Sequence, residues 1–152
     1  MTVPAIALRA GVTPSTIYRR WGTLQQLLSD VALERLRPDT EPPDTGSFAG
    51  DLRLWMEQYA DEMASAPGRA LIRDVLGGSE SGNACQCSAF TTAHIERIRE
   101  RASARGETAA DVETIMDQIF APLMYRILFG AVPPSAEDAH RLVARALRAF
   151  PR

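Results

Sequence analysis

The chain has 152 residues, which fits one compact domain, or one domain with a small appendage, and can bury a core without disulfide or metal staples. It is 45% hydrophobic and 24% charged, and no run approaches the roughly 18 apolar residues of a membrane-spanning helix. The N-terminal stretch is too short and interrupted for a signal peptide, so we expect a cytoplasmic protein. The net charge is −2, yet residues 1–21 contain Arg9, Arg19 and Arg20 and no acid. A nucleic-acid contact, if there is one, is expected at this end.

Hydrophobic residues recur at helical spacing almost throughout, and no run alternates strictly as a strand would. The sequence therefore predicts an all-α fold. A first helix is expected over residues 3–10 and a second over 14–20, with Thr13 as the N-cap of the second. A third helix begins after Thr23.

The composition changes at residues 37–47, "RPDTEPPDTGS", where three prolines exclude a helix interior. This stretch is typical of a linker. We therefore divide the chain into an N-terminal segment 1–37, a linker 38–47 and a C-terminal helical domain 48–152.

Apolar stripes predict the helices of the C-terminal domain. They are expected over residues 52–63, 67–76, 88–104, 112–128 and 139–150. Pro122 lies inside the fourth of these helices, where it removes one i→i−4 hydrogen bond and should kink the helix. Residues 77–83 and 130–135 are expected to be a loop and a turn.

The stretch "AGVTPSTIYRRW", residues 10–21, has the spacing of a helix-turn-helix. Ala7 is small where a second helix would pack, Gly11 suits a left-handed turn, and Ile17 would fill the angle between the helices. The second helix would then present polar side chains outward, and an α-helix fits the major groove of DNA. The alternative interpretation is an ordinary helical corner with solvated arginines.

The longer string "TVPAIALRAGVTPSTIYRRW" resembles the DNA-binding domain of the tetracycline-repressor (TetR) family, and "GTLQQLL" after it resembles the next helix of that domain. "APLMYRILFG", residues 121–130, is similar to the penultimate helix of one C-terminal subgroup. The resemblance implies a helix-turn-helix domain followed by a helical ligand-binding and dimerisation domain. The family pattern also has a further helix before residue 2 and a lysine in the place of Leu24. Residues 1–37 are therefore expected to form an N-terminally incomplete DNA-binding domain.

The resemblance implies a DNA-binding transcriptional regulator, expected to be a repressor that a small apolar ligand releases from its operator. The alternative is a helical dimerisation or small-molecule-binding module that binds DNA weakly or not at all in this form. The expected partners are double-stranded operator DNA, an unknown small-molecule effector and a second copy of the chain. We expect no enzyme activity, cofactor or metal, because the sequence offers no nucleophile with a plausible base, glycine-rich phosphate loop or paired buried carboxylates.

Three sets of site residues follow from the pattern and the resemblance. Base edges are expected to meet Ser15, Arg19 and Arg20, and phosphates to meet Thr13, Thr16 and Tyr18. An apolar ligand pocket is expected to be lined by Trp55, Tyr59, Met63, Phe90, His94, Phe120, Met124 and Tyr125. A dimer interface, formed as a four-helix bundle, is expected at Ile119, Leu123, Ile127, Leu142, Val143, Ala146 and Phe150.

Two cysteines, Cys85 and Cys87, lie one residue apart, which fits neither a disulfide framework nor a zinc pattern without more ligands. We interpret them as incidental. A redox sensor is the alternative, but such thiols need electropositive neighbours and the nearby sequence offers none. His94 shares a helical face with Phe90 and Ile98, which is typical of a core or pocket-lining histidine.

Overall fold

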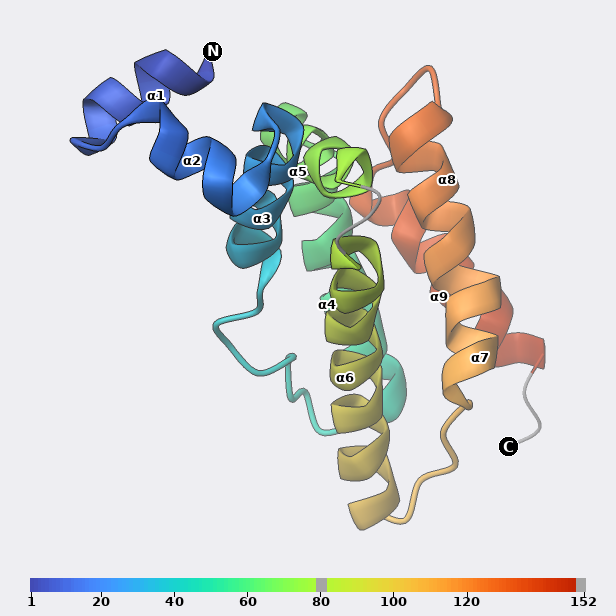
Figure 1. Cartoon of the computed structure of the whole chain (residues 1–152). Coiled ribbons are helices and arrows are strands. Elements are labelled where there is room, and N and C mark those ends of the chain that lie inside the picture. Colours follow the sequence, from blue (N-terminus) through green and yellow to red (C-terminus); the bar gives the residue numbers. More distant parts are fainter. Residues whose placement is uncertain (79–81, 150–152) are drawn as a thin grey trace. The chain divides into compact units, whose positions relative to one another are not determined.

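The structure is a computed structural model that describes residues 1–78 and 82–149 (Figure 1). Within these residues helices are joined by turns and loops, with no strand, which confirms the predicted all-α fold. No helix of the described part is both long enough and apolar enough to cross a membrane. The chain forms two compact units, the first made of residues 1–37 and 71–87 and the second of residues 38–70 and those from 88 onward.

The first unit begins with three short helices: α1 (Val3–Ala10), α2 (Pro14–Trp21) and α3 (Leu24–Leu36). Two glycines with positive φ end α1 and α2, Gly11 with φ 68° and Gly22 with φ 72°. A Cβ is disfavoured at such angles, so these residues let the chain turn at once into the next helix. The predicted bounds of α1 and α2 are confirmed to within one residue.

The end of α5 (Ala66–Gly77) and the start of α6 (Asn83–Ala104) complete the first unit. Gly78, the residue after α5, lies close to α3: a Cβ added to it would lie 2.3 Å from the Oγ of Ser29. The sequence predicted that α6 starts near residue 88, and this is wrong. It starts at Asn83, so both cysteines lie inside the helix.

The second unit contains α4 (Phe48–Met63), the rest of α6, α7 (Val112–Ile115), a π-helical turn η1 (Met116–Phe120), α8 (Ala121–Phe129) and α9 (Ala136–Ala149). α4 packs along α9, and α9 also contacts η1 and α8. The largest fully buried apolar side chains of this unit are those of Leu52, Met56, Ile95, Ile98, Ile115, Ile119, Leu123 and Val143.

The predicted long helix over residues 112–128 is interrupted in a different way from the expected kink. Its middle turn, η1, is a π-helix, and Pro122 lies in the first turn of α8 directly after it. A proline has no N–H to donate to the preceding turn. The wider turn is found where that bond is missing, and both Ile119 and Phe120 within it are buried.

The linker segment is held by arginines on one face of α6. Arg101 donates from Nη1 to the carbonyl oxygens of Pro42 (2.7 Å) and Pro43 (2.9 Å). Arg97, one turn earlier, pairs with Glu41 at 2.8 Å. The segment is extended, without a helix, as its prolines indicated. The division of the chain at residues 38–47 into two functional domains stays a prediction.

Candidate DNA-binding surface and ligand site

The corner between α1 and α2 is built on a small apolar core. Ala7 is completely buried and Ile17 is 4% exposed, which confirms that both face inward. Val3 and Leu27 complete this core, and Trp21 packs half-buried against it. The core holds α2 against α1 and α3, so the remaining face of α2 points outward.

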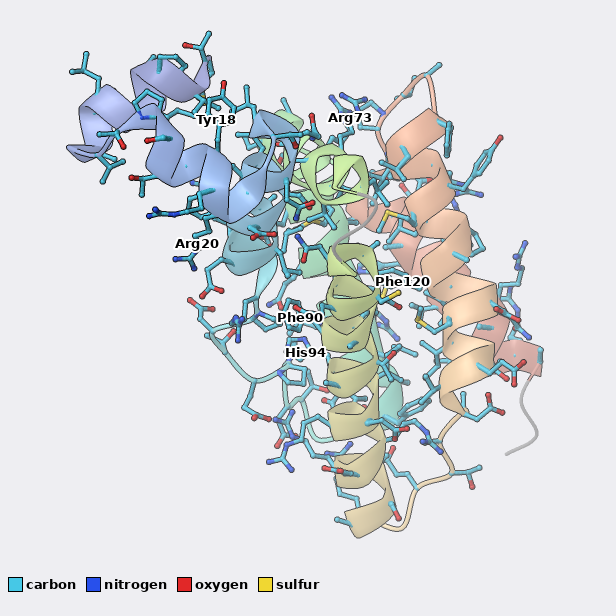
Figure 2. All side chains as sticks on the ribbon, in the orientation of Figure 1. Tyr18, Arg20, Arg73, Phe90, His94 and Phe120 are labelled. Carbon is cyan, nitrogen blue, oxygen red and sulfur yellow. The ribbon has the colours of Figure 1, made fainter. Side chains whose placement is uncertain are left out.

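That outward face of α2 carries the residues predicted to contact DNA. All six are exposed: Thr13, Ser15, Thr16, Tyr18, Arg19 and Arg20. Tyr18 and Arg20 both project from α2 in Figure 2, and Tyr18 is 49% exposed. The structure therefore brings the six predicted side chains onto one short element.

The N-terminus of α2 differs in detail from the prediction. Thr13 occupies the N-cap position, but its hydroxyl contacts the hydroxyls of Ser15 (2.9 Å) and Thr16 (3.0 Å) rather than a backbone N–H of the described chain. A cluster of three hydroxyls therefore lies at the positive end of the helix dipole. Such a site suits a phosphate oxygen, which accepts hydrogen bonds and carries negative charge.

Arg20 lies against an aromatic ring. Its Cζ is 4.9 Å from the centroid of the Trp21 ring, a cation–π arrangement. The indole Nε1 of Trp21 donates to Oδ2 of Asp30 on α3 at 3.0 Å. The guanidinium of Arg20 is therefore oriented by an aromatic ring that is itself fixed to the next helix.

Asp30 also accepts a hydrogen bond from Asn83, the first residue of α6. Asn83 Nδ2 donates to Asp30 Oδ1 at 2.7 Å and to the Oγ of Ser29 at 2.9 Å, and Gln26 Nε2 donates to Asp30 Oδ1 at 2.9 Å. The hydrogen bond from Asn83 contributes most to lowering the pKa of Asp30, desolvation opposes it, and bonds from Gln26 and Trp21 add to the lowering. Asp30 and Asn83 were missed by sequence reasoning, because an Asn that follows a glycine-rich loop is also typical of a turn.

A cluster of aromatic rings lies in the second unit, where the ligand pocket was predicted. Trp55 and Tyr59 on α4 have ring centroids 6.3 Å apart, and the Phe120 centroid lies 6.4 Å from Trp55 and 4.8 Å from Tyr59. His94 on α6 meets Trp55 edge-on at 5.9 Å. The structure thus brings together four of the eight predicted pocket residues from three separate elements.

His94 is the polar member of this cluster. Trp55 Nε1 donates to His94 Nδ1 at 3.1 Å, so the neutral imidazole carries its proton on Nε2. Desolvation lowers the pKa of His94, while the charge of Glu41 and a hydrogen bond with the backbone of Thr40 raise it. The ring is held between the aromatic cluster and the linker segment, and burial favours its neutral form.

The other predicted pocket residues lie in different surroundings. Met63 is buried, and Phe90 and Met124 are half-buried. Figure 2 shows Phe90 and His94 on successive turns of α6. Tyr125 is 67% exposed and its ring lies 5.2 Å from that of Phe129, so it belongs to the surface of α8.

The side chains predicted for a dimer interface are covered within a single chain. The six described members are at most 4% exposed: Ile119, Leu123, Ile127, Leu142, Val143 and Ala146. The seventh, Phe150, lies outside the described residues. The exposed large apolar side chains at and after α8 include Tyr125, Phe129 (73%) and Val132 (78%).

The two cysteines lie in the first turns of α6. Cys85 is exposed and Cys87 is partly buried. Burial raises the pKa of the Cys87 thiol, which disfavours the reactive thiolate. This environment gives no support to redox sensing at Cys87.

Comparison with known families assigns both parts of the chain. Residues 1–31 match the family of bacterial regulatory proteins named tetR. Residues 42–146 match the tetracyclin repressor-like C-terminal domain. The two matches together take in the corner of α1 and α2 and the elements that carry the aromatic cluster.

Individual relatives are regulators of the helix-turn-helix type. The regulator AqdR of Rhodococcus erythropolis is 36% identical over 76 residues, which are 50% of this chain and 37% of AqdR. An uncharacterized regulator of Mycobacterium tuberculosis is 28% identical over 149 residues, covering 94% of this chain and 74% of that protein. The regulator YdeS of Bacillus subtilis is 27% identical over 137 residues, with coverages of 84% and 68%.

Proposed function

Because this chain belongs to the TetR family of DNA-binding transcriptional regulators, we propose that it represses transcription as a homodimer that a small apolar ligand releases from its operator. The observation that supports this most directly is the polar outer face of α2, held outward by the buried Ala7 and Ile17. A homodimer places two such helices on a DNA site with matching half-sites.

The residues of α2 divide into two roles in this proposal. Thr13, Thr16 and Tyr18 contact phosphates and set the register of the helix, because hydroxyls at a helix start suit phosphate oxygens. Ser15 and Arg19 meet base edges. Arg20 is placed over Trp21 and reaches DNA from there.

Selection from a random library of DNA duplexes tests the DNA-binding role. The wild-type chain should enrich a sequence with two related half-sites. Arg19→Ala should relax the preference at one base pair of each half-site, because a bidentate arginine–guanine contact is worth about 1–3 kcal/mol of discrimination. Arg9→Ala is the matched control, since it removes one exposed arginine from α1 and should leave the preference unchanged.

Two outcomes would contradict this role. An unchanged base preference in Arg19→Ala would remove Arg19 from base recognition. If the wild-type chain enriches no duplex at low salt, the alternative applies, a helical dimerisation or small-molecule-binding module.

The ligand is proposed to bind at the aromatic cluster of Trp55, Tyr59, His94 and Phe120. Aromatic walls with one polar group suit an apolar molecule that carries a single hydrogen-bonding group. Met63, Phe90 and Met124 are proposed as flanking walls, since methionine side chains adapt to ligand shape. Tyr125 is not included in this proposal because of its exposure.

A matched pair of phenylalanine variants tests the ligand site. A panel of uncharged aromatic and aliphatic compounds is screened, one at a time, for a rise in Tm of the wild-type chain. A compound that binds at the cluster should lose its effect in Phe120→Ala and keep it in Phe129→Ala, whose side chain is exposed. If the rise in Tm were lost only in Phe129→Ala, the compound would bind at the surface of α8 instead.

A further inference from the structure

A continuous series of contacts in the first unit leads from the start of α6 to the arginine at the end of α2. Asn83 donates to Asp30 at 2.7 Å, Asp30 accepts from Trp21 at 3.0 Å, and the ring of Trp21 carries Arg20 at 4.9 Å. The four residues come from α6, α3 and α2. These polar and cation–π contacts act on Trp21 in addition to its packing against the apolar core of the corner.

Asn83 is held in this position by burial and by two hydrogen bonds from its side-chain amide. It is 6% exposed, and its amide contacts the fully buried Ser29 as well as Asp30. Ser29 in turn donates to the carbonyl oxygen of Val75 on α5 at 3.1 Å. A Cβ on Gly78 would lie 2.3 Å from the Oγ of Ser29, so the chain after α5 packs closely against α3 beside these bonds.

The carboxylate of Asp30 is the shared element of the series. One oxygen accepts from Asn83 and Gln26, and the other accepts from Trp21. Hydrogen bonds to an ionised acceptor are shorter and stronger than those between neutral groups. Asn83 therefore fixes the rotation of the carboxylate, and the carboxylate fixes the indole.

We propose that Asn83 and Asp30 are positioning residues for DNA binding, which set the place of Trp21 and, through it, of the Arg20 guanidinium. This inference rests on the proposed role of α2 as the recognition helix. It adds that the first residue of α6 is coupled to a DNA-facing side chain. A displacement of α6 at Asn83 then changes the DNA affinity without any contact between Asn83 and DNA.

Exchanging the side-chain amide of Asn83 and the carboxylate of Asp30 tests whether these residues are coupled to Trp21. Asn83→Asp places two carboxylates against each other, and Asp30→Asn removes the charge that the indole and both amides contact. The double variant Asn83→Asp with Asp30→Asn restores one amide facing one carboxylate, and the amide oxygen at position 30 can still accept from Trp21. Gln86→Glu is the matched control, because it makes the same change at an exposed position of α6 one turn later.

Two measurements are made on the full chain. The first is affinity for the duplex selected with the wild-type chain. The second is the proton shift of the Trp21 indole N–H, assigned by comparison with Trp55→Phe, since the chain has two tryptophans. The indole shift reports the bond to Asp30 whether or not DNA is bound.

Each single variant should weaken DNA binding about tenfold, the equivalent of one charge-assisted hydrogen bond, and move the Trp21 indole signal upfield. The double variant should recover part of both, because Trp21 keeps an acceptor while Ser29 loses its donor and Gln26 its charged acceptor. Gln86→Glu should change neither. An unchanged indole signal in Asn83→Asp would overturn the proposal, as would a double variant no better than the single ones. If the wild-type chain selects no duplex, the proposed function fails and the indole signal alone decides the coupling.

Discussion

Gly11 determines the corner between α1 and α2 by its backbone alone. Its φ is 68°, and an added Cβ would meet nothing within 4 Å. Gly11→Ala should therefore lower the free energy of unfolding by about 1–2 kcal/mol through backbone strain, without a steric clash. Gly11→Asn should recover part of this loss, because asparagine enters the left-handed region more readily than alanine. Urea unfolding measures both, and equal stability of all three chains would show that the turn relaxes.

Asp30 should make the stability of the chain depend on acid pH. Its pKa is lowered in the folded state, chiefly by the hydrogen bond from Asn83. A depressed carboxyl pKa contributes stability that is present above the unfolded-state pKa of about 3.9 and is lost as the pH falls through the folded-state value. The stability difference between wild type and Asp30→Asn should therefore shrink from about pH 6 to about pH 3.

Urea unfolding at the two pH values measures this difference. Asp74→Asn, on α5, is the control for the loss of one carboxylate in the same unit. If the wild-type chain were more stable than Asp30→Asn by the same amount at both pH values, ionisation of Asp30 would not stabilise the folded state.

At the scale of residues, the sequence predicted those whose role is set by size or backbone conformation. Ala7, Gly11 and Ile17 are such residues, because a helical corner leaves room for few alternatives. Asp30 and Asn83 could not be found, because their contact joins positions 53 residues apart and depends on how α3 meets α6. Polar pairs carry no periodic signal.

Asp51 connects three elements of the second unit. It is fully buried at the start of α4, and its carboxylate accepts from the Thr45 hydroxyl at 2.8 Å and from Arg105, after α6, at 3.0 Å. Asp51→Ala removes this buried acceptor from Thr45 and Arg105, while Glu107 still pairs with Arg105 at 2.6 Å, so the free energy of unfolding should fall by about 1–3 kcal/mol. Asp44 contacts the same arginine at 3.3 Å but is 58% exposed.

Asp44→Ala is therefore the matched control for Asp51→Ala. An exposed ion pair contributes about 0–1 kcal/mol, so this variant should unfold in urea almost as wild type does. If the two variants lost equal stability, burial would not be what makes the contact with Asp51 important.

At the scale of elements, most helices could be predicted because their apolar stripes and caps are local features. The start of α6 could not, since its first turn carries no apolar stripe and follows a glycine-rich loop. All four rings of the aromatic cluster were among the predicted pocket residues. Trp55 and Tyr59 share one helix, whereas the approach of His94 and Phe120 depends on tertiary packing. Tyr125 was wrongly included in the predicted pocket, because it lies two residues, about 200°, from the buried Leu123 and is therefore exposed on the opposite side of α8.

The fold of the single chain and the proposed homodimer should respond differently to charges placed on α8 and α9. Leu142 is 4% exposed and packs inside the chain, so Leu142→Glu should unfold the protein. Tyr125→Glu with Phe129→Glu places charges on an exposed apolar surface, and these should split a homodimer while leaving the fold intact. Sedimentation and circular dichroism of both variants measure the two effects.

The exposed Gln58→Glu on α4 serves as a control for an added charge. A folded Leu142→Glu monomer would instead return the dimer interface to the residues predicted from the sequence. A wild-type chain that sediments as a monomer at micromolar concentration would remove the dimer from the proposal.

At the scale of the whole molecule, the sequence predicted which side chains of α8 and α9 are buried but not what buries them. Two adjacent apolar stripes were expected to need a second copy of the chain. The stripe of α9 is instead covered by α4, which packs along it within one chain. Helical periodicity identifies which face of a helix is buried, but the element that buries this face depends on the topology of the fold.

The π turn η1 has a consequence for the angular phase of the helix that follows. Successive residues of an α-helix are about 100° apart, and a π turn takes up one additional residue, so the residues after it keep the phase that an α-helix shorter by one residue would give them. Leu123 and Ile127 point inward, and Tyr125 and Phe129 outward, in the phase that this turn sets. Deleting Gln118, which is exposed, should let an ordinary α turn replace η1 and leave the outer face of α8 outward, because the deletion removes the residue that the π turn takes up.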